Sequence, residues 1–201
     1  MSIKAFFCIL LLLPVVLLCG CTGEQEDNDL ALQLRADFLD RTGCAGTMEV
    51  TADYGQRVYG YTVTFSGDET DGLNLVITAP EEAAGITATT AQGQTFLTFD
   101  GVQLETGPLN EDGLSPLDAL PAFLTAMESG YIAETGTELL GETEALRLCC
   151  RVPERAPGQG LETLLWFDKT EQTLLQGELR QDGTTVIRCT FSDFLLTKAA
   201  E

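Results

Sequence analysis

Alternation of apolar and polar residues, repeated along most of the chain after Gly46, most constrains the fold of this sequence. In the clearest run, Tyr59, Tyr61, Val63 and Phe65 alternate with glycine and threonine. Because successive side chains of a strand point to opposite faces, such a run predicts a strand with one buried face. Turn-forming residues between such runs predict an antiparallel meander. Strands are expected at 47–52, 59–65, 73–79, 86–90, 94–99, 102–106, 143–152, 161–167, 173–181 and 185–194.

Two segments have helical spacing instead. Apolar residues from Leu30 to Phe38 recur on one face of a helix, so a helix is expected at about 29–41. Further along, Ser115 can cap a second helix, with a proline in the first helical position and apolar residues on one face up to a stop at Gly130. The expected fold class is therefore α+β, with one antiparallel sheet, an N-terminal helix and an inserted helix.

The first twenty residues have the pattern of an export signal. Lys4 precedes a nearly unbroken apolar run of fifteen residues from Ala5 to Cys19. A membrane-spanning helix usually needs about 17–25 apolar residues, and Pro14 would kink one here. A cleaved signal peptide is therefore favoured, with an uncleaved membrane anchor as the alternative.

The apolar run ends in Leu18-Cys19-Gly20-Cys21, which resembles the bacterial lipobox. In signals of that kind the chain is cut before the last cysteine, whose thiol receives a diacylglycerol group. The resemblance implies lipidation of Cys21 and an exported protein anchored by lipid to the outer face of the bacterial cell membrane. The expected divisions are a signal peptide at 1–20, an acidic tether at 21–29 and one β-rich domain at 30–197.

Charge and histidine content exclude several classes of function. The chain has 11 basic and 31 acidic side chains, a net charge of −20, and such a chain lacks the cationic face that nucleic acids require. It contains no histidine, so Ser-His-Asp and Cys-His catalysis and histidine-ligated zinc are impossible. A protein that binds without catalysis is expected, with no cofactor.

The cysteines allow several kinds of chemistry. An exported chain permits disulfides, and Cys44, Cys149, Cys150 and Cys189 are the candidates for them. One disulfide could involve Cys44, although its partner cannot be assigned from the sequence. Cys149 lies between two arginines, which predicts a lowered pKa and a reactive thiol. Cys150 and Cys189 have apolar neighbours at a spacing of two and are expected to be buried. No Cys-x-x-Cys pair is present and the acidic turns lack the spacing of a calcium loop, so no metal is expected.

The candidate ligand-binding surface is a stripe of aromatic and aliphatic side chains. On one face of a sheet, these residues could line a cavity for an acyl chain. The alternative is that the inserted helix, from Leu117 to Met127, packs over the stripe as ordinary core. The stripe consists of Tyr59, Tyr61, Val63, Phe65, Leu75, Ile77, Phe96 and Trp166.

The order of lipobox, helix, long meander and inserted helix resembles the LolA/LolB lipoprotein-carrier superfamily, over about residues 28–196. The end of the chain is also similar to the end of that family's members, in Leu165-Trp166-Phe167-Asp168-Lys169, Gly177-Glu178-Leu179, Asp182-Gly183 and Thr190-Phe191-Ser192-Asp193-Phe194.

The resemblance implies an incomplete β-barrel, that is, a strongly curved antiparallel sheet with helices on its concave side. Some members of the family carry acyl chains in that hollow, which implies a lipid or another hydrophobic ligand. The resemblance extends to the germination lipoprotein GerS-like branch, whose members support a cell-wall amidase of the spore cortex by binding it. The two functional hypotheses are therefore a carrier of an apolar ligand and a scaffold for a cell-wall hydrolase.

Overall fold

The computed structural model describes residues 22–68, 71–91, 94–106 and 114–198 of the chain. The expected signal peptide and the expected lipidation site, Cys21, lie outside the described residues. The described residues form two helices, α2 (Thr22–Leu39) and α3 (Ala119–Ser129). They also form the strands β1 (Arg41–Asp53), β2 (Val58–Asp68), β3 (Gly72–Ala79), β4 (Thr87–Ala91), β5 (Gln94–Phe99), β6 (Val102–Glu105), β7 (Ile132–Leu140), β8 (Thr143–Arg151), β9 (Leu161–Asp168), β10 (Leu174–Gln181) and β11 (Thr184–Lys198).

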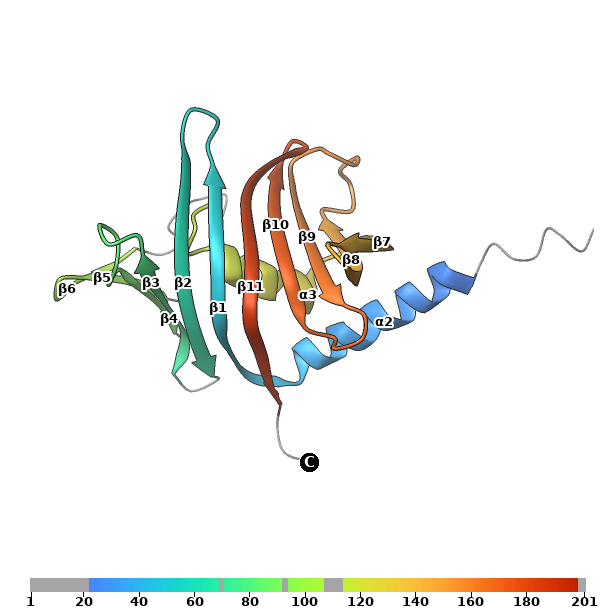
Figure 1. Cartoon of the computed structure of the whole chain (residues 1–201), viewed down its shortest axis with the longest axis horizontal. Helices are drawn as coiled ribbons and strands as arrows, with labels where there is room; N and C mark the ends of the chain where they lie inside the picture. The colour runs from blue at the N-terminus through green and yellow to red at the C-terminus, as the bar shows by residue number, and fades with distance from the viewer. Residues whose placement is uncertain (1–21, 69–70, 92–93, 107–113, 199–201) are drawn as a thin grey trace, which may run out of the picture.

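All these strands form one antiparallel sheet, as the alternation predicts. Its order is β6-β5-β4-β3-β2-β1-β11-β10-β9-β8-β7, so the first and last strands of the chain's meander, β1 and β11, pair in the middle. The strands β6 and β7 form the two ends of the sheet and are not paired with each other. The sheet curves around α3 without closing, which is the incomplete barrel that the family resemblance implies (Figure 1).

The strand β7 has no counterpart among the strands predicted from the sequence. Its sequence, from Ile132 to Leu140, places glycine, threonine and glutamate where a half-buried strand would alternate apolar residues. It forms because it pairs along its length with β8, and because α2 lies against it. Tertiary contacts therefore decide the conformation of this segment rather than its own pattern.

The segment expected to be an acidic tether is helical instead. Helix α2 begins at Thr22, so residues 22–29 form its first turns, and it ends at Leu39. Acidic residues near a helix N-terminus are favourable because they oppose the positive end of the helix dipole. Asp27 also fixes this part of the helix to the sheet, because its carboxylate accepts hydrogen bonds from Thr137 and from Lys169, the latter at 3.0 Å.

The inserted helix α3 lies where the second helix is predicted, but it begins at Ala119, so the prediction that Ser115 caps it and that the next proline is its first residue is wrong. Its start is preceded by a turn in which Ser115 Oγ accepts the backbone N–H of Asp118 at 3.1 Å, so the serine caps this turn and Asp118 is the N-cap of the helix. Gly130 follows the last turn with an extended backbone, at φ −66°, rather than the left-handed conformation common at helix ends.

Helix α3 fills the inner face of the sheet, defined here as the face on which α3 lies. Leu120, Phe123 and Met127 are fully buried. The ring of Phe123 lies against the backbone of Gly177 on β10, where an added Cβ would come within 2.6 Å of the ring. From α2, Phe38 packs edge-on against Phe167 of β9, with ring centroids 5.8 Å apart.

The outer face of the C-terminal half is held by ion pairs. Glu178 is only 2% exposed, and its two carboxylate oxygens accept hydrogen bonds from Arg180 and Arg188 at 2.8 Å. Burial acts to raise the pKa of Glu178, but the hydrogen bonds from the two arginines outweigh it and the pKa is lowered. The carboxylate therefore stays ionised in the folded protein.

Gly177→Ala tests the packing of α3 on the sheet. The new methyl group would meet the ring of Phe123, and overpacking of this kind costs about 1–3 kcal/mol in the free energy of unfolding. Gly136→Ala is the matched control, because it is also a strand glycine but an added Cβ meets nothing within 4 Å. Urea unfolding should show a loss of stability for Gly177→Ala alone, and equal stability of the two variants would contradict this account of the core.

Candidate ligand cleft

The structure brings together six of the eight residues of the predicted ligand-binding stripe. On the inner face, Val63 lies opposite Ile77 and Phe65 opposite Leu75, and all four side chains are buried. At the other end of β2, the rings of Tyr59 and Tyr61 stack with centroids 6.5 Å apart, and these side chains are not fully buried. Four members of the stripe are thus part of the core beneath α3, and its two tyrosines lie near the surface.

Phe96 and Trp166 do not join this surface. Trp166 lies on the outer face, where it packs with Cys149 and Leu164 and its indole N–H donates to Glu138 at 3.0 Å. Phe96 is next to Leu97, which packs against the inner core, so by alternation Phe96 faces outward. The sequence itself could have indicated both placements. Leu165 and Phe167 flank Trp166, and Leu97 follows Phe96, so these apolar neighbours could occupy the inner face and leave Trp166 and Phe96 on the outer face.

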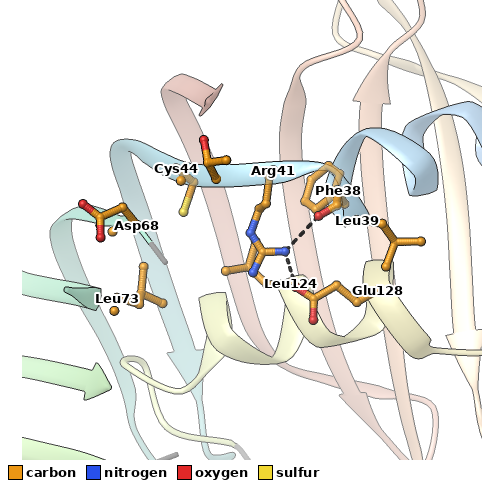
Figure 2. Close-up of a pocket in the computed structure, with 12 residues that line it drawn as sticks. Phe38, Leu39, Arg41, Cys44, Asp68, Leu73, Leu124 and Glu128 are labelled. Carbon is orange, nitrogen blue, oxygen red and sulfur yellow. Dashed lines mark hydrogen bonds and ion pairs between the residues drawn. The ribbon is translucent and has the colours of Figure 1, made fainter. Parts of the chain in front are cut away.

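A cleft opens at one end of the inner face (Figure 2). It lies where the end of α2, the start of β1, the ends of β2 and β3 that meet in their hairpin, and the last turns of α3 come together, and its volume is about 340 Å³. Its apolar lining is Phe38, Leu39, Cys44, Leu73 and Leu124. None of these residues belongs to the predicted stripe.

Arg41 lies at the rim of this cleft and connects the two helices. Its guanidinium donates to the backbone carbonyl of Phe38 at 3.1 Å and forms an ion pair with Glu128 of α3, as Figure 2 shows. A second arginine, Arg35, also connects α2 to the end of α3. Its guanidinium donates to the backbone carbonyls of Met127 and Gly130 at 2.8 and 2.6 Å. The two arginines satisfy backbone carbonyls at helix ends that would otherwise lack partners.

The strand side of the cleft is built on glycines. Gly43, Gly67 and Gly72 lie on three neighbouring strands, and Gly72 has a φ of +74°. A Cβ added at Gly43 would come within 2.6 Å of the carbonyl oxygen of Gly67, and one at Gly67 within 2.6 Å of that of Gly72. Side chains are therefore excluded here, and a second, more polar hollow of about 670 Å³ shares these glycines and extends toward Ser66 and Asn74.

The cysteines contradict the prediction of a reactive thiol. Cys44, Cys149, Cys150 and Cys189, the four cysteines in the described part of the chain, are free and buried. Burial raises the pKa of every one of them, for Cys150 to about 11. At Cys149 the neighbouring carboxylates of Glu162 and Glu134 raise the pKa further, and the two flanking arginines lower it too little to compensate.

The reason for this difference lies in the ion pairs of the outer face. Arg147 pairs with Glu138 at 2.8 Å and Arg151 with Glu134 at 2.6 Å, so neither guanidinium is an isolated positive charge beside the thiol.

Among the described residues, no group of three or more metal-binding side chains lies close enough to hold a metal ion. No helix of the described part is long and apolar enough to cross a membrane.

The thiols give a direct test. In a chain that begins at Thr22, which keeps only the four buried cysteines, we expect almost no reaction with Ellman's reagent at pH 8, because the thiols are protonated and shielded. Guanidinium chloride should release all four. A fast reaction of one thiol in the folded protein, lost in Cys149→Ser, would instead support the reactive thiol that the flanking arginines suggest.

Comparison with known proteins gives the class of fold. No protein-family model matches the sequence, and no curated protein matches it. Among solved structures, the chain is similar to an uncharacterized conserved protein from Thermus thermophilus, with a TM-score of 0.52 and 11% identity over 87% of this chain and 90% of that one. At such identity the likeness concerns the fold.

Two further similarities have lower TM-scores. A LolA superfamily protein from Nitrosomonas europaea has a TM-score of 0.41 and 10% identity, over 89% of this chain and 96% of that one. A chain from the complex of the CwlD amidase with the GerS lipoprotein of Clostridioides difficile has a TM-score of 0.43 and 15% identity, over 88% and 96%. The open antiparallel sheet with an N-terminal and an inserted helix is the fold class expected from the sequence.

Proposed function

We propose that this chain is a non-catalytic, membrane-anchored bacterial lipoprotein whose LolA-like domain binds an acyl chain of a lipid, or another hydrophobic ligand, in the cleft beside Arg41. The observation that supports this proposal is the cleft itself, whose walls include Phe38, Leu73 and Leu124 and whose rim bears an ion pair. Ligand sites typically combine apolar walls with a few polar groups in this way.

The volume of the cleft limits how much of a lipid it can hold. Ligand pockets usually have volumes of about 300–1,000 Å³, so a cleft of about 340 Å³ is at the lower limit. It suits the end of one acyl chain rather than a whole lipid. Beyond the cleft the inner face is filled by Leu120 and Phe123, so deeper insertion of a ligand requires α3 to move away from the sheet.

The polar rim suits the other end of an amphiphile. Arg41 and Glu128 offer opposite charges at the mouth, and their side chains are 22% and 35% exposed. A neutral or zwitterionic headgroup at the mouth could contact both side chains without leaving either charge unpaired. A ligand buried entirely inside the cleft would not contact this ion pair. Histidine-dependent catalysis is impossible in this chain, which is consistent with binding rather than turnover.

Leu73→Trp tests the cleft by filling it. Losing apolar contact with an acyl chain costs about 1 kcal/mol or more, so the dissociation constant of a fluorescent fatty acid should rise about fivefold or more. Leu139→Trp is the matched control, because it adds the same side chain at a residue that is 74% exposed and outside the cleft. The measurement is a fluorescence titration of the chain from Thr22 onward.

Lipid bound in cells provides the second arm of this test. Solvent extracts of the purified protein, analysed by mass spectrometry, should contain a non-covalent lipid that is depleted in Leu73→Trp. If the extracts are empty and the fatty acid does not bind the parent protein, the ligand-binding proposal fails.

The anchor rests on the lipobox, and Cys21→Ala tests it. Because the thiol of Cys21 is the expected acceptor of diacylglycerol, this variant should move from the membrane fraction to the soluble fraction of lysed cells. A control with Cys19→Ala, which leaves Cys21 in place, should stay with the membrane. Retention of Cys21→Ala in the membrane fraction would favour an uncleaved apolar anchor instead.

A second candidate function is a scaffold that binds and supports an extracytoplasmic cell-wall hydrolase, such as an amidase of the spore cortex. The observation that favours it is the closed inner face, where Phe123 is fully buried against Gly177. A packed inner face leaves the outside of the molecule as its binding surface. The lipid measurement separates the two functions, because a scaffold needs no bound lipid.

A further inference from the structure

The charge of this chain is distributed unevenly along its length. From Val58 to Leu146 there is no lysine, arginine or histidine, while acidic residues recur throughout. This cation-free segment forms β2 to β6, α3 and β7. Six of the eleven basic residues of the chain instead lie on or beside the C-terminal strands and are paired with acids: Arg147, Arg151, Lys169, Arg180, Arg188 and Lys198. The strands β2 to β6 and the turns between them therefore carry acidic side chains and no basic ones.

The strand β6 forms the edge at that end of the sheet. Among the described strands, β6 pairs only with β5. β6 pairs with β5 through a tight turn in which Asp100 and Gly101 both have positive φ, 49° and 76°. The closing pair is Phe99 with Val102, and the backbone N–H of Thr106 donates to Thr95 at 3.0 Å. Since hydrogen-bonded and non-bonded pairs alternate in an antiparallel hairpin, the backbone groups of Gln103 and Glu105 point away from β5.

Nothing in β6 protects this edge in the usual way apart from its shortness. Natural edge strands are commonly guarded by lysine, proline or a bulge, and Val102–Glu105 has none of these. Instead, an apolar row lies on the same face as Leu97, with Phe99, Val102 and Leu104 exposed by 49%, 61% and 58%. Asp100 and Glu105 flank this row with negative charge.

We propose that β6 is a docking edge for an extended, cationic segment of a partner protein, which pairs with the backbone of Gln103 and Glu105 as an added strand. Backbone hydrogen bonds would supply register, and the apolar row would accept alternate side chains of the partner. Lysine or arginine at the remaining positions would meet Glu105 and Asp100. This surface shares no residue with the cleft, so the proposal goes beyond the proposed ligand-binding function.

Charge also argues against a second copy of the chain as the occupant. A copy that paired through its own β6 would bring the same acidic residues together, and like charges directly opposite each other destabilise a strand pair. A four-residue edge offers few hydrogen bonds, so the contact is expected to be weak and reversible, and sensitive to salt.

The test uses the full-length protein in non-ionic detergent and a fluorescent peptide of alternating lysine and valine. Fluorescence anisotropy should show binding that weakens with added salt, while a peptide of alternating glutamate and valine should not bind. Gln103→Pro removes an N–H that points away from β5, so it leaves the hairpin bonds intact and should weaken binding at least tenfold. Leu104→Ser, which removes one apolar contact without touching the backbone, should weaken it several-fold.

The matched control lies at the other end of the sheet. By the same alternation, counted from the closing pair of Leu140 with Thr143, the backbone N–H of Leu139 on β7 also points outward, so Leu139→Pro blocks that edge instead. It should leave peptide binding unchanged. Circular dichroism should report a folded sheet for all three variants.

Three results would overturn the proposal. One is equal binding of the cationic peptide to the parent protein, Gln103→Pro and Leu104→Ser. Another is equal binding of the cationic and acidic peptides. The third is self-association of the parent protein in analytical ultracentrifugation that Gln103→Pro abolishes, because the occupant of the edge would then be a second copy. None of these results alters the fatty-acid titration, so this proposal and the ligand-binding proposal fail independently.

Discussion

An antiparallel sheet that curves but does not close has an apolar inner face that must be buried against something other than itself. In this chain the requirement is met by α3, and its central contact is that of Phe123 with the bare backbone of Gly177. The absence of a side chain at that one position of β10 lets the helix sit close to the strands. The aromatic rings of Phe38, Phe167, Phe191 and Phe194 then pack around it from α2 and the neighbouring strands.

The helices are held to each other as well as to the sheet. Arg35 and Arg41 both extend from the last turns of α2, or just after it, to the end of α3, where they meet backbone carbonyls and the carboxylate of Glu128. The cleft lies beside these contacts, so a ligand that enters it would act on the junction that holds α3 in place. In the proposed function, binding of a ligand in the cleft would therefore affect the position of α3.

Sequence patterns predicted the sheet well because period-two alternation reports directly which face of a strand is buried. They failed where long-range contacts decide the outcome. β7 has no clear alternation and forms by pairing with β8, and residues 22–29 are helical because Asp27 is held by Thr137 and Lys169, which are distant in sequence. The cleft could not be predicted, because it arises from glycines and helix ends that are brought together only by the fold.

Individual side chains show the same limit. Trp166 is included in the predicted ligand-binding stripe as an aromatic residue, but it alternates with Leu165 and Phe167, which face the inner core, so it lies on the outer face. The two neighbours of Cys149 in sequence suggest a reactive thiol, whereas its pKa depends on burial and on Glu134 and Glu162, which come from other strands. Local sequence thus indicated which residues are distinctive, and the strand pairing decided what surrounds them.

The helical start of the domain has a consequence for a chain anchored at Cys21. A flexible tether would let the domain rotate freely above the bilayer, whereas α2 begins one residue after the proposed anchor and is fixed to the body by Asp27. The helix then sets a fixed distance between the anchor and its far end, because its 18 residues span about 27 Å at a rise of about 1.5 Å per residue. The cleft lies at its far end, beside Phe38 and Leu39, so an acyl chain leaving the membrane at the anchor would have to travel the length of α2 to reach it.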